Sequence, residues 1–198
     1  GHPALSVDEK ELYFVSDMPG GFGATDLYKV SISNDGTYGV PENLGKKINT
    51  EGREMFPYIS AKNVLYFSSD GHIGLGALDI FESSIHSDNY SEPSNLGSPI
   101  NSNRDDFSFA IIEEQTKGYF SSNRSGGKGD DDIYSFTVYR CKEQIQGIVF
   151  DSTSNKVIPF ANVQLVDAEG KVIKRTQTNQ AGFYDFGSVS CEKKYTVV

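Results

Sequence analysis

The chain has 198 residues, of which 37% are hydrophobic and 12% are aromatic, and its formal net charge is -9. This composition is typical of a folded chain with one large or two small domains, and it excludes an intrinsically disordered protein. The negative charge, with no cluster of Lys and Arg among aromatic residues, excludes the usual nucleic-acid-binding surface. No apolar run approaches the ~20 residues that span a bilayer, so we expect no transmembrane segment. Residues 1–20 also lack the features of a signal peptide.

A short motif occurs three times at a constant spacing. Each copy contains Tyr-Phe, ends on Ser followed by Asp or Asn, and precedes a glycine-rich stretch and an Asp-aliphatic-aromatic triplet. The motif copies are residues 12–17, 65–70 and 118–123, and the triplets are residues 26–28, 79–81 and 132–134. Tyr13, Tyr66 and Tyr119 are 53 residues apart, as are the Asp residues of the triplets. A repeat of this length, built from short strands and turns, is typical of β-propeller blades.

Each repeat predicts a blade of up to four strands in an all-β fold. The expected strands and outer segments are 3–6, 11–16, 26–33 and 38–44 in the first repeat, 56–60, 64–69, 79–84 and 93–102 in the second, and 106–109, 118–123 and 132–136 in the third. Continuous apolar runs fit strands that are buried on both faces between neighbouring blades. Gly118 stands where the other copies have Leu, and we expect it to loosen that strand.

The first two repeats end in a shared outer segment. It reads Pro-x-Asn-Leu-Gly and then Ile-Asn, at residues 41–49 and 93–101, and no copy follows the third repeat. Propellers commonly close such an open sheet edge with a strand from the other end of the chain. Because a ring needs about 4–8 blades, we expect residues 1–140 to be about three blades from the C-terminal part of a larger propeller.

From Gln144 onward the pattern changes to short alternating strands separated by Asp, Asn and Gly turns. The expected strands are 146–150, 160–166, 172–178 and 182–186, and residues 195–198 read as the start of another. This pattern predicts a small transthyretin-like or immunoglobulin-like β-sandwich over residues 141–198, which we expect to be incomplete.

The two cysteines, Cys141 and Cys191, both lie in this C-terminal segment. They are either two free, buried thiols or a disulfide that closes the small domain. We favour the disulfide because the cysteines flank one small domain, and it would place the protein in an oxidising compartment.

Two family resemblances rest on these motifs. Residues 3–8, 12–17 and 20–28 resemble the WD40-like repeat of TolB-type propellers, and the likeness extends over about residues 1–136. The patterns at 147–151, 159–165 and 178–186 are similar to the carboxypeptidase regulatory-like domain. This order of domains resembles Bacteroidetes outer-membrane proteins of the OmpA family, including PorE-like components of type IX secretion. The resemblance implies a periplasmic, outer-membrane-associated protein with envelope proteins as partners. It also implies peptidoglycan contact through a domain downstream of residue 198.

The candidate chemical sites are few. Asp26, Asp79 and Asp132 each end a glycine-rich turn and could ligate calcium, but we expect each to accept backbone N–H bonds within its own turn. The richer cluster, Asp130–Asp132, reads as a solvated acidic turn. We therefore expect no bound cofactor, with calcium as the alternative.

Catalytic motifs are lacking in the sequence. There is no Gly-x-Ser-x-Gly elbow, and the three histidines lie outside any metal-ligand spacing, at positions 2, 72 and 86. The favoured hypothesis is a non-catalytic protein-interaction scaffold, not an enzyme. The alternatives are the accessory propeller of a hydrolase whose catalytic domain lies elsewhere, or a glycan-binding module. Candidate surface aromatics are Phe22, Tyr38 and Tyr90, although most Phe and Tyr residues should pack between blades.

Overall fold

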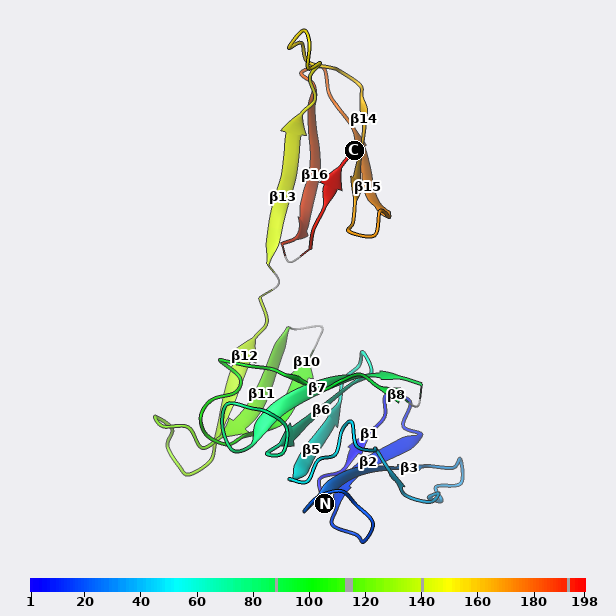
Figure 1. The fold of residues 1–198 in the computed structure, drawn as a ribbon, viewed down its shortest axis with the longest axis vertical. Coiled ribbons are helices and arrows are strands. Elements are labelled where there is room, and N and C mark those ends of the chain that lie inside the picture. Colours follow the sequence, from blue (N-terminus) through cyan, green and yellow to red (C-terminus); the bar gives the residue numbers. More distant parts are fainter. Residues whose placement is uncertain (88, 113–115, 140, 192) are drawn as a thin grey trace. The chain divides into compact units, whose positions relative to one another are not determined.

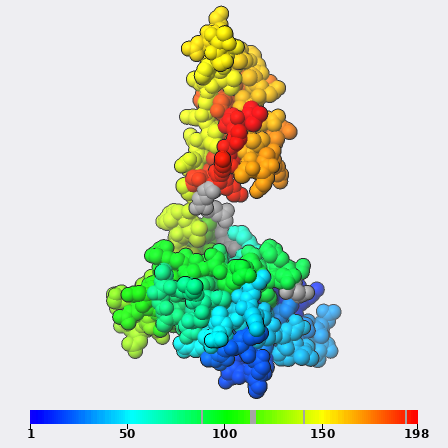
Figure 2. All heavy atoms as spheres, viewed as in Figure 1, coloured from blue at the N-terminus to red at the C-terminus, as the bar shows by residue number. Residues whose placement is uncertain are grey.

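The fold is that of a computed structural model, which describes residues 1–198 except 88, 113–115, 140 and 192. The described chain consists of strands and turns without helices, so the predicted all-β class is confirmed. It divides into two compact units, Gly1–Val138 and Tyr139–Val198. Figure 1 labels the strands, and Figure 2 shows the heavy atoms coloured along the sequence.

Three antiparallel sheets follow one another along the first unit. The first has the order β1-β2-β3-β4, with β1 Ala4–Leu5, β2 Glu11–Ser16, β3 Asp26–Ser31 and β4 Glu42–Asn43. The second has the order β5-β6-β7-β8, with β9 also pairing with β7; its strands are β5 Glu54–Ile59, β6 Val64–Ser69, β7 Asp79–His86, β8 Asn89–Tyr90 and β9 Ser94–Asn95. The third has the order β10-β11-β12, with β10 Asp106–Ile112, β11 Lys117–Ser122 and β12 Asp132–Thr137.

The pairing register is the same in all three sheets. In each sheet the last Ser of one strand faces the first Asp of the next, and two aromatic residues face each other two positions further in. The pairs are Ser16–Asp26, Ser69–Asp79, Ser122–Asp132, Phe14–Tyr28, Phe67–Phe81 and Phe120–Tyr134. The 53-residue period of the sequence is therefore also the period of strand pairing.

The second sheet is covered on both faces, and β6 is buried from Leu65 to Ser69. Alternate residues of a strand point to opposite faces. Leu65 and Phe67 join a core with residues of the first sheet, whereas Tyr66 joins a core with Phe109 and Phe120 of the third. This explains why β6 is apolar on both faces instead of alternating with polar residues.

Gly118 does not loosen the third sheet, contrary to the sequence-based expectation. β11 has six residues, as β2 and β6 have. Gly118 lies directly opposite Phe136, whose ring would collide with a Cβ atom at position 118. In the second sheet the equivalent pair is Leu65 and Ser83. In the third sheet the large side chain of this pair is therefore on β12, and in the second sheet it is on β6, so the space between the paired residues is filled in both.

The second unit contains two antiparallel sheets. One has the order β13-β16 and the other β15-β14-β17, with β13 Lys142–Ile148, β14 Asn162–Val166, β15 Val172–Gln177, β16 Phe183–Ser190 and β17 Thr196–Val197. Val163 and Leu165 of one sheet share a core with Phe186 and Val189 of the other. β13 begins earlier and β16 ends later than the sequence pattern predicted, because the two strands pair up to the cysteines.

Candidate functional site

The three Asp residues of the repeat occupy equivalent positions and bond their own glycine-rich turns. Asp26 accepts the N–H groups of Phe22 and Gly23 at 2.6 and 3.0 Å. In the same way Asp79 accepts two N–H groups of its turn at 2.6 and 3.0 Å, and Asp132 accepts two at 2.8 and 3.2 Å. Each carboxylate therefore organises a loop locally.

These turns require glycine because the backbone comes very close to the carboxylate. A Cβ atom at Gly74 would collide with Asp79, and one at Gly127 would collide with Asp132. The glycines of these stretches thus allow the turn backbone to pack closely against the Asp carboxylate.

The outer segments of the first two sheets bind their sheets through asparagine side chains. Asn49 accepts the N–H of Leu27 at 2.8 Å and donates to its carbonyl at 3.0 Å. It also donates to Asn43, which donates in turn to Asp26 at 2.7 Å. Asn49 is 2% exposed, so these bonds are shielded from water.

The second sheet repeats most of this arrangement. Asn101 bonds the N–H and the carbonyl of Ile80, both at 2.8 Å, and donates to Asn95 at 2.8 Å. Leu96 also donates its N–H to the Ile80 carbonyl at 3.1 Å, as Leu44 does to Leu27 in the first sheet. The asparagine pair is therefore a repeated device that attaches the outer segment.

A cleft of about 350 Å³ lies between the first two sheets. Its lining includes Ser6, Asp8, Glu11, Tyr13 and Asn63. Lys29 donates to the Glu11 carboxylate at 2.7 Å and Tyr13 donates to it at 3.1 Å. The Ser6 hydroxyl and a backbone N–H lower the pKa of Asp8 below its ordinary value. The cleft thus presents carboxylate, hydroxyl and amide groups.

Within the described ranges, no group of three or more His, Cys, Asp or Glu side chains is placed to hold a metal ion. His2 stacks on Phe56 at 4.0 Å between ring centroids, and burial together with the N-terminal charge lowers its pKa. His72 lies against Phe81 and contacts the carbonyl of Ile48 at 2.8 Å. These histidines therefore belong to packing contacts.

The candidate surface aromatics divide into two groups. Phe22 and Tyr38 are exposed, at 38% and 65%, but Tyr90 is 9% exposed and belongs to the core between the first two sheets. Its hydroxyl lies 3.5 Å from that of Tyr13. The expectation for Tyr90 was wrong because β8 turns its side chain inward, and the sequence carries no sign of this short strand.

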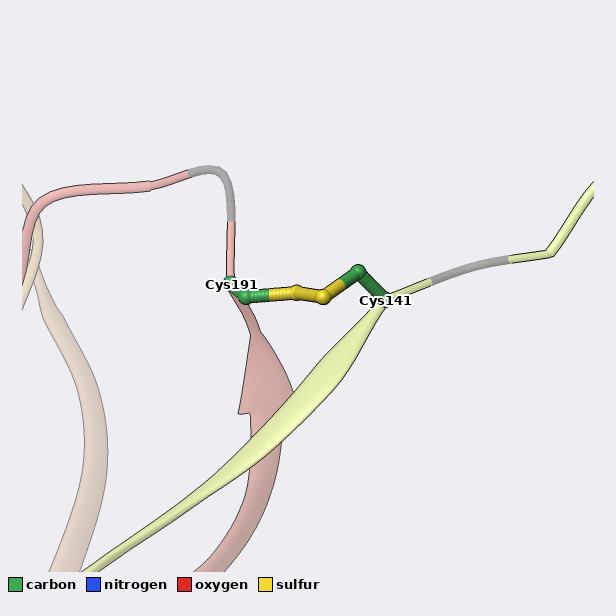
Figure 3. Close-up of a disulfide and its surroundings, with 2 residues drawn as sticks. All are labelled: Cys141 and Cys191. Carbon is green, nitrogen blue, oxygen red and sulfur yellow. A yellow bond between two sulfur atoms is a disulfide. The ribbon is translucent and has the colours of Figure 1, made fainter.

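Cys141 and Cys191 form a disulfide with a Cα–Cα distance of 5.6 Å (Figure 3). The bond joins the start of β13 to the end of β16, where Lys142 pairs with Ser190. It closes the segment that contains the second unit's core.

The comparison with protein families concerns this second unit. The sequence model of the carboxypeptidase regulatory-like domain family matches residues 144–198, which confirms that part of the resemblance. The match fits the two sheets and shared core of a β-sandwich. No curated protein matches the chain.

One feature of the first unit escaped sequence reasoning. Tyr119 and Ile133, on the third sheet, are 48% and 78% exposed. The residues equivalent to Tyr119, which are Tyr13 and Tyr66, are 1% and 8% exposed, and those equivalent to Ile133, which are Leu27 and Ile80, are 0% exposed. The repeat predicts buried positions here, and only the structure shows that nothing in the described part of the chain covers them.

Proposed function

We propose that the chain is a non-catalytic protein-interaction scaffold of the cell envelope, in which the first unit supplies three blades of a β-propeller. The observation that supports this most directly is the open face of the third sheet. Exposed apolar residues that cluster on a sheet mark surfaces for other proteins. Tyr119 and Ile133 hold positions that a neighbouring sheet covers elsewhere in the same unit.

The propeller interpretation is supported by the sheets themselves. Three antiparallel sheets with one register, packed face to face through aromatic residues, are what successive blades require. The order of these repeats and a carboxypeptidase regulatory-like domain supports the resemblance to OmpA-family proteins and type IX secretion components.

The envelope location is supported by the disulfide. Disulfides persist in oxidising compartments such as the periplasm and are rare in the cytosol. The described residues contain no helix with the length and apolarity to cross a bilayer. On the basis of the disulfide, we propose a periplasmic protein that associates with the outer membrane through protein partners.

Cell fractionation and affinity purification of the tagged native protein test this proposal. We expect it in the envelope fraction, with its cysteines protected from alkylation, together with outer-membrane or secretion components. Tyr119→Glu should reduce partner recovery, whereas Tyr38→Glu, at an exposed side chain between β3 and β4, should not. A cytoplasmic protein with free thiols and no partners would refute the proposal, and hydrolase activity of the purified chain would refute its non-catalytic part.

The cleft between the first two sheets favours a glycan as a second candidate ligand. Its carboxylate, hydroxyl and amide groups are of the kinds that bind sugar hydroxyls. Calorimetric titration with soluble peptidoglycan fragments tests this function. Saturable heat would support it, and its absence at millimolar sugar would rule it out.

A further inference from the structure

The outer edge of β12 differs from the equivalent edges of β3 and β7. In the first sheet, Tyr28 and Lys29 of β3 pair with Asn43 and Glu42 of β4. In the second sheet, β7 pairs with β9 in the same way. In the third, β12 pairs with β11 on one side, and no described residue pairs with its other side.

In the first two sheets, the outer segment forms hydrogen bonds with the residues equivalent to those at this edge. Leu27 and Ile80 each donate their N–H to an Asn side chain, and the same side chain donates to their carbonyl. A Leu N–H also donates to that carbonyl. Both are 0% exposed. The equivalent residue, Ile133, is 78% exposed, and no described residue bonds it in this way.

We propose that the β12 edge binds an extended peptide segment of the type Pro-x-Asn-Leu-Gly-x-x-Ile-Asn, supplied by a separate polypeptide. Addition of a strand to an open sheet edge is an established mode of peptide recognition. The two segments of this type within residues 1–198 are already bound to the first and second sheets, so the occupant lies outside these residues.

The two internal examples define the chemistry of the occupant. The second Asn bonds both backbone groups of Ile133, as Asn49 and Asn101 do for their partners. The first Asn lies next to Asp132 and donates to it, as Asn43 donates to Asp26. The Leu and Ile cover the exposed Ile133 side chain, because Leu44 and Ile48 share a core with Leu27. Gly follows the Leu at a backbone φ near +84° in Gly45 and +65° in Gly97, a region that other residues rarely adopt.

A peptide titration tests the proposal. The probe is a fluorescein-labelled synthetic peptide with the sequence of residues 41–50, and the chain of residues 1–198 is titrated into it while anisotropy is measured. We expect saturable binding. The peptide with Ala in place of the second Asn should bind at least about tenfold more weakly, because the N–H and carbonyl groups of Ile133 would then be buried without a hydrogen-bond partner. A scrambled peptide of the same composition and charge should not bind.

Matched variants of the chain locate the site. Ile133→Lys should weaken binding at least about tenfold, because the charged side chain replaces the apolar one that the Leu and Ile cover. Ile73→Lys adds the same charge at a side chain that is 97% exposed in the turn between β6 and β7, and it should leave binding unchanged. Both positions are exposed, so neither substitution removes a core contact.

Hydrogen exchange identifies the edge directly. With bound peptide, the amide of Ile133 should exchange more slowly, and those of β3 and β7 should be unaffected. Equal binding of the scrambled peptide, or no saturable binding, would refute the proposal. Protection at β3 or β7 would also refute it, because the peptide would then have displaced an existing outer segment. Association of the chain with itself through this edge, seen as a dimer that the peptide does not dissociate, would assign the edge to a second copy instead.

Discussion

At the scale of single residues, two buried carboxylates at equivalent positions find different hydrogen-bond partners. Glu54 and Asp106 begin the inner strands of the second and third sheets and are both 0% exposed. Glu54 reaches the hydroxyl of Ser69 at 2.7 Å. Asp106 is one methylene shorter, and Arg124 reaches down to it instead. The guanidinium also lies 4.8 Å from the centre of the Phe120 ring.

Arg124→Ala should destabilise the first unit by about 2–4 kcal/mol, because it leaves a buried carboxylate without its cation. Urea denaturation followed by circular dichroism measures the change. Arg53→Ala is the matched control, because Arg53 is 50% exposed and its partner Asp70 is 22% exposed, so this pair should contribute less than about 1 kcal/mol. Equal losses in the two variants would show that burial of Asp106 does not decide the effect.

Tyr13 makes alkaline stability dependent on one buried hydroxyl. Burial, together with the neighbouring Tyr90 and Glu11, raises the pKa of Tyr13 far above its ordinary value of about 10. The unfolded chain therefore releases this proton above about pH 10, while the folded chain retains it. The contribution of Tyr13 to the free energy of unfolding is thus fully present below pH 10 and is lost as pH rises above it.

Tyr13→Phe should remove this pH dependence. The variant is expected to be less stable than the wild type at pH 8, where it lacks the hydrogen bond to Glu11. The difference in the free energy of unfolding should shrink between pH 8 and pH 11. Denaturant titrations across this range measure it, and parallel pH profiles for the two proteins would contradict the prediction.

At the scale of elements, the third sheet predicts a coupled pair of substitutions. Gly118→Leu should destabilise the unit by about 1–3 kcal/mol, because the new side chain meets the Phe136 ring. Adding Phe136→Ser recreates the Leu–Ser pair of the second sheet and should recover part of the loss. A double-mutant cycle measures the coupling, and strictly additive effects would show that the two positions do not share one space.

Strand positions were largely predictable because the repeat supplies them three times. The Tyr-Phe motif and the Asp triplet fix β2, β3, β6, β7, β11 and β12, whose alternation and turn residues agree with one another. The shared outer segment also marks β4 and β9, but the short strand β8 depends on pairing with β7, so no local pattern marks it. The compensation between Gly118 and Phe136 also lay beyond sequence reasoning, because it joins residues on different strands.

At the scale of the whole molecule, the disulfide stabilises one unit only. Chain-entropy arguments for the 50-residue separation of its cysteines give about 4 kcal/mol. The double variant Cys141→Ser/Cys191→Ser should therefore lower the melting temperature of residues 139–198 and leave that of residues 1–138 unchanged. Scanning calorimetry with and without reductant measures both transitions, and a shift in the first unit would show that the two units unfold together.

The local parts of the candidate site could be read from the sequence, and the surfaces could not. Asp26, Asp79 and Asp132 bond residues three and four positions earlier, so the spacing alone indicates their partners. The exposure of Ile133 depends on whether another sheet covers it, which no pattern around residue 133 encodes. The asparagine bonds link residues about 22 positions apart, which makes them visible only when two copies are compared in space.

The central position of the second sheet has a consequence for cooperativity. Among the described residues, the first and third sheets each share a core with the second, so the unit behaves as a short linear array with nearest-neighbour coupling. The end sheets can open while one interface remains, but opening of the second sheet breaks both interfaces. Amides of β6 should therefore exchange with solvent only when the whole array unfolds. During synthesis, the second sheet reaches its full stability only after the residues of the third sheet have left the ribosome.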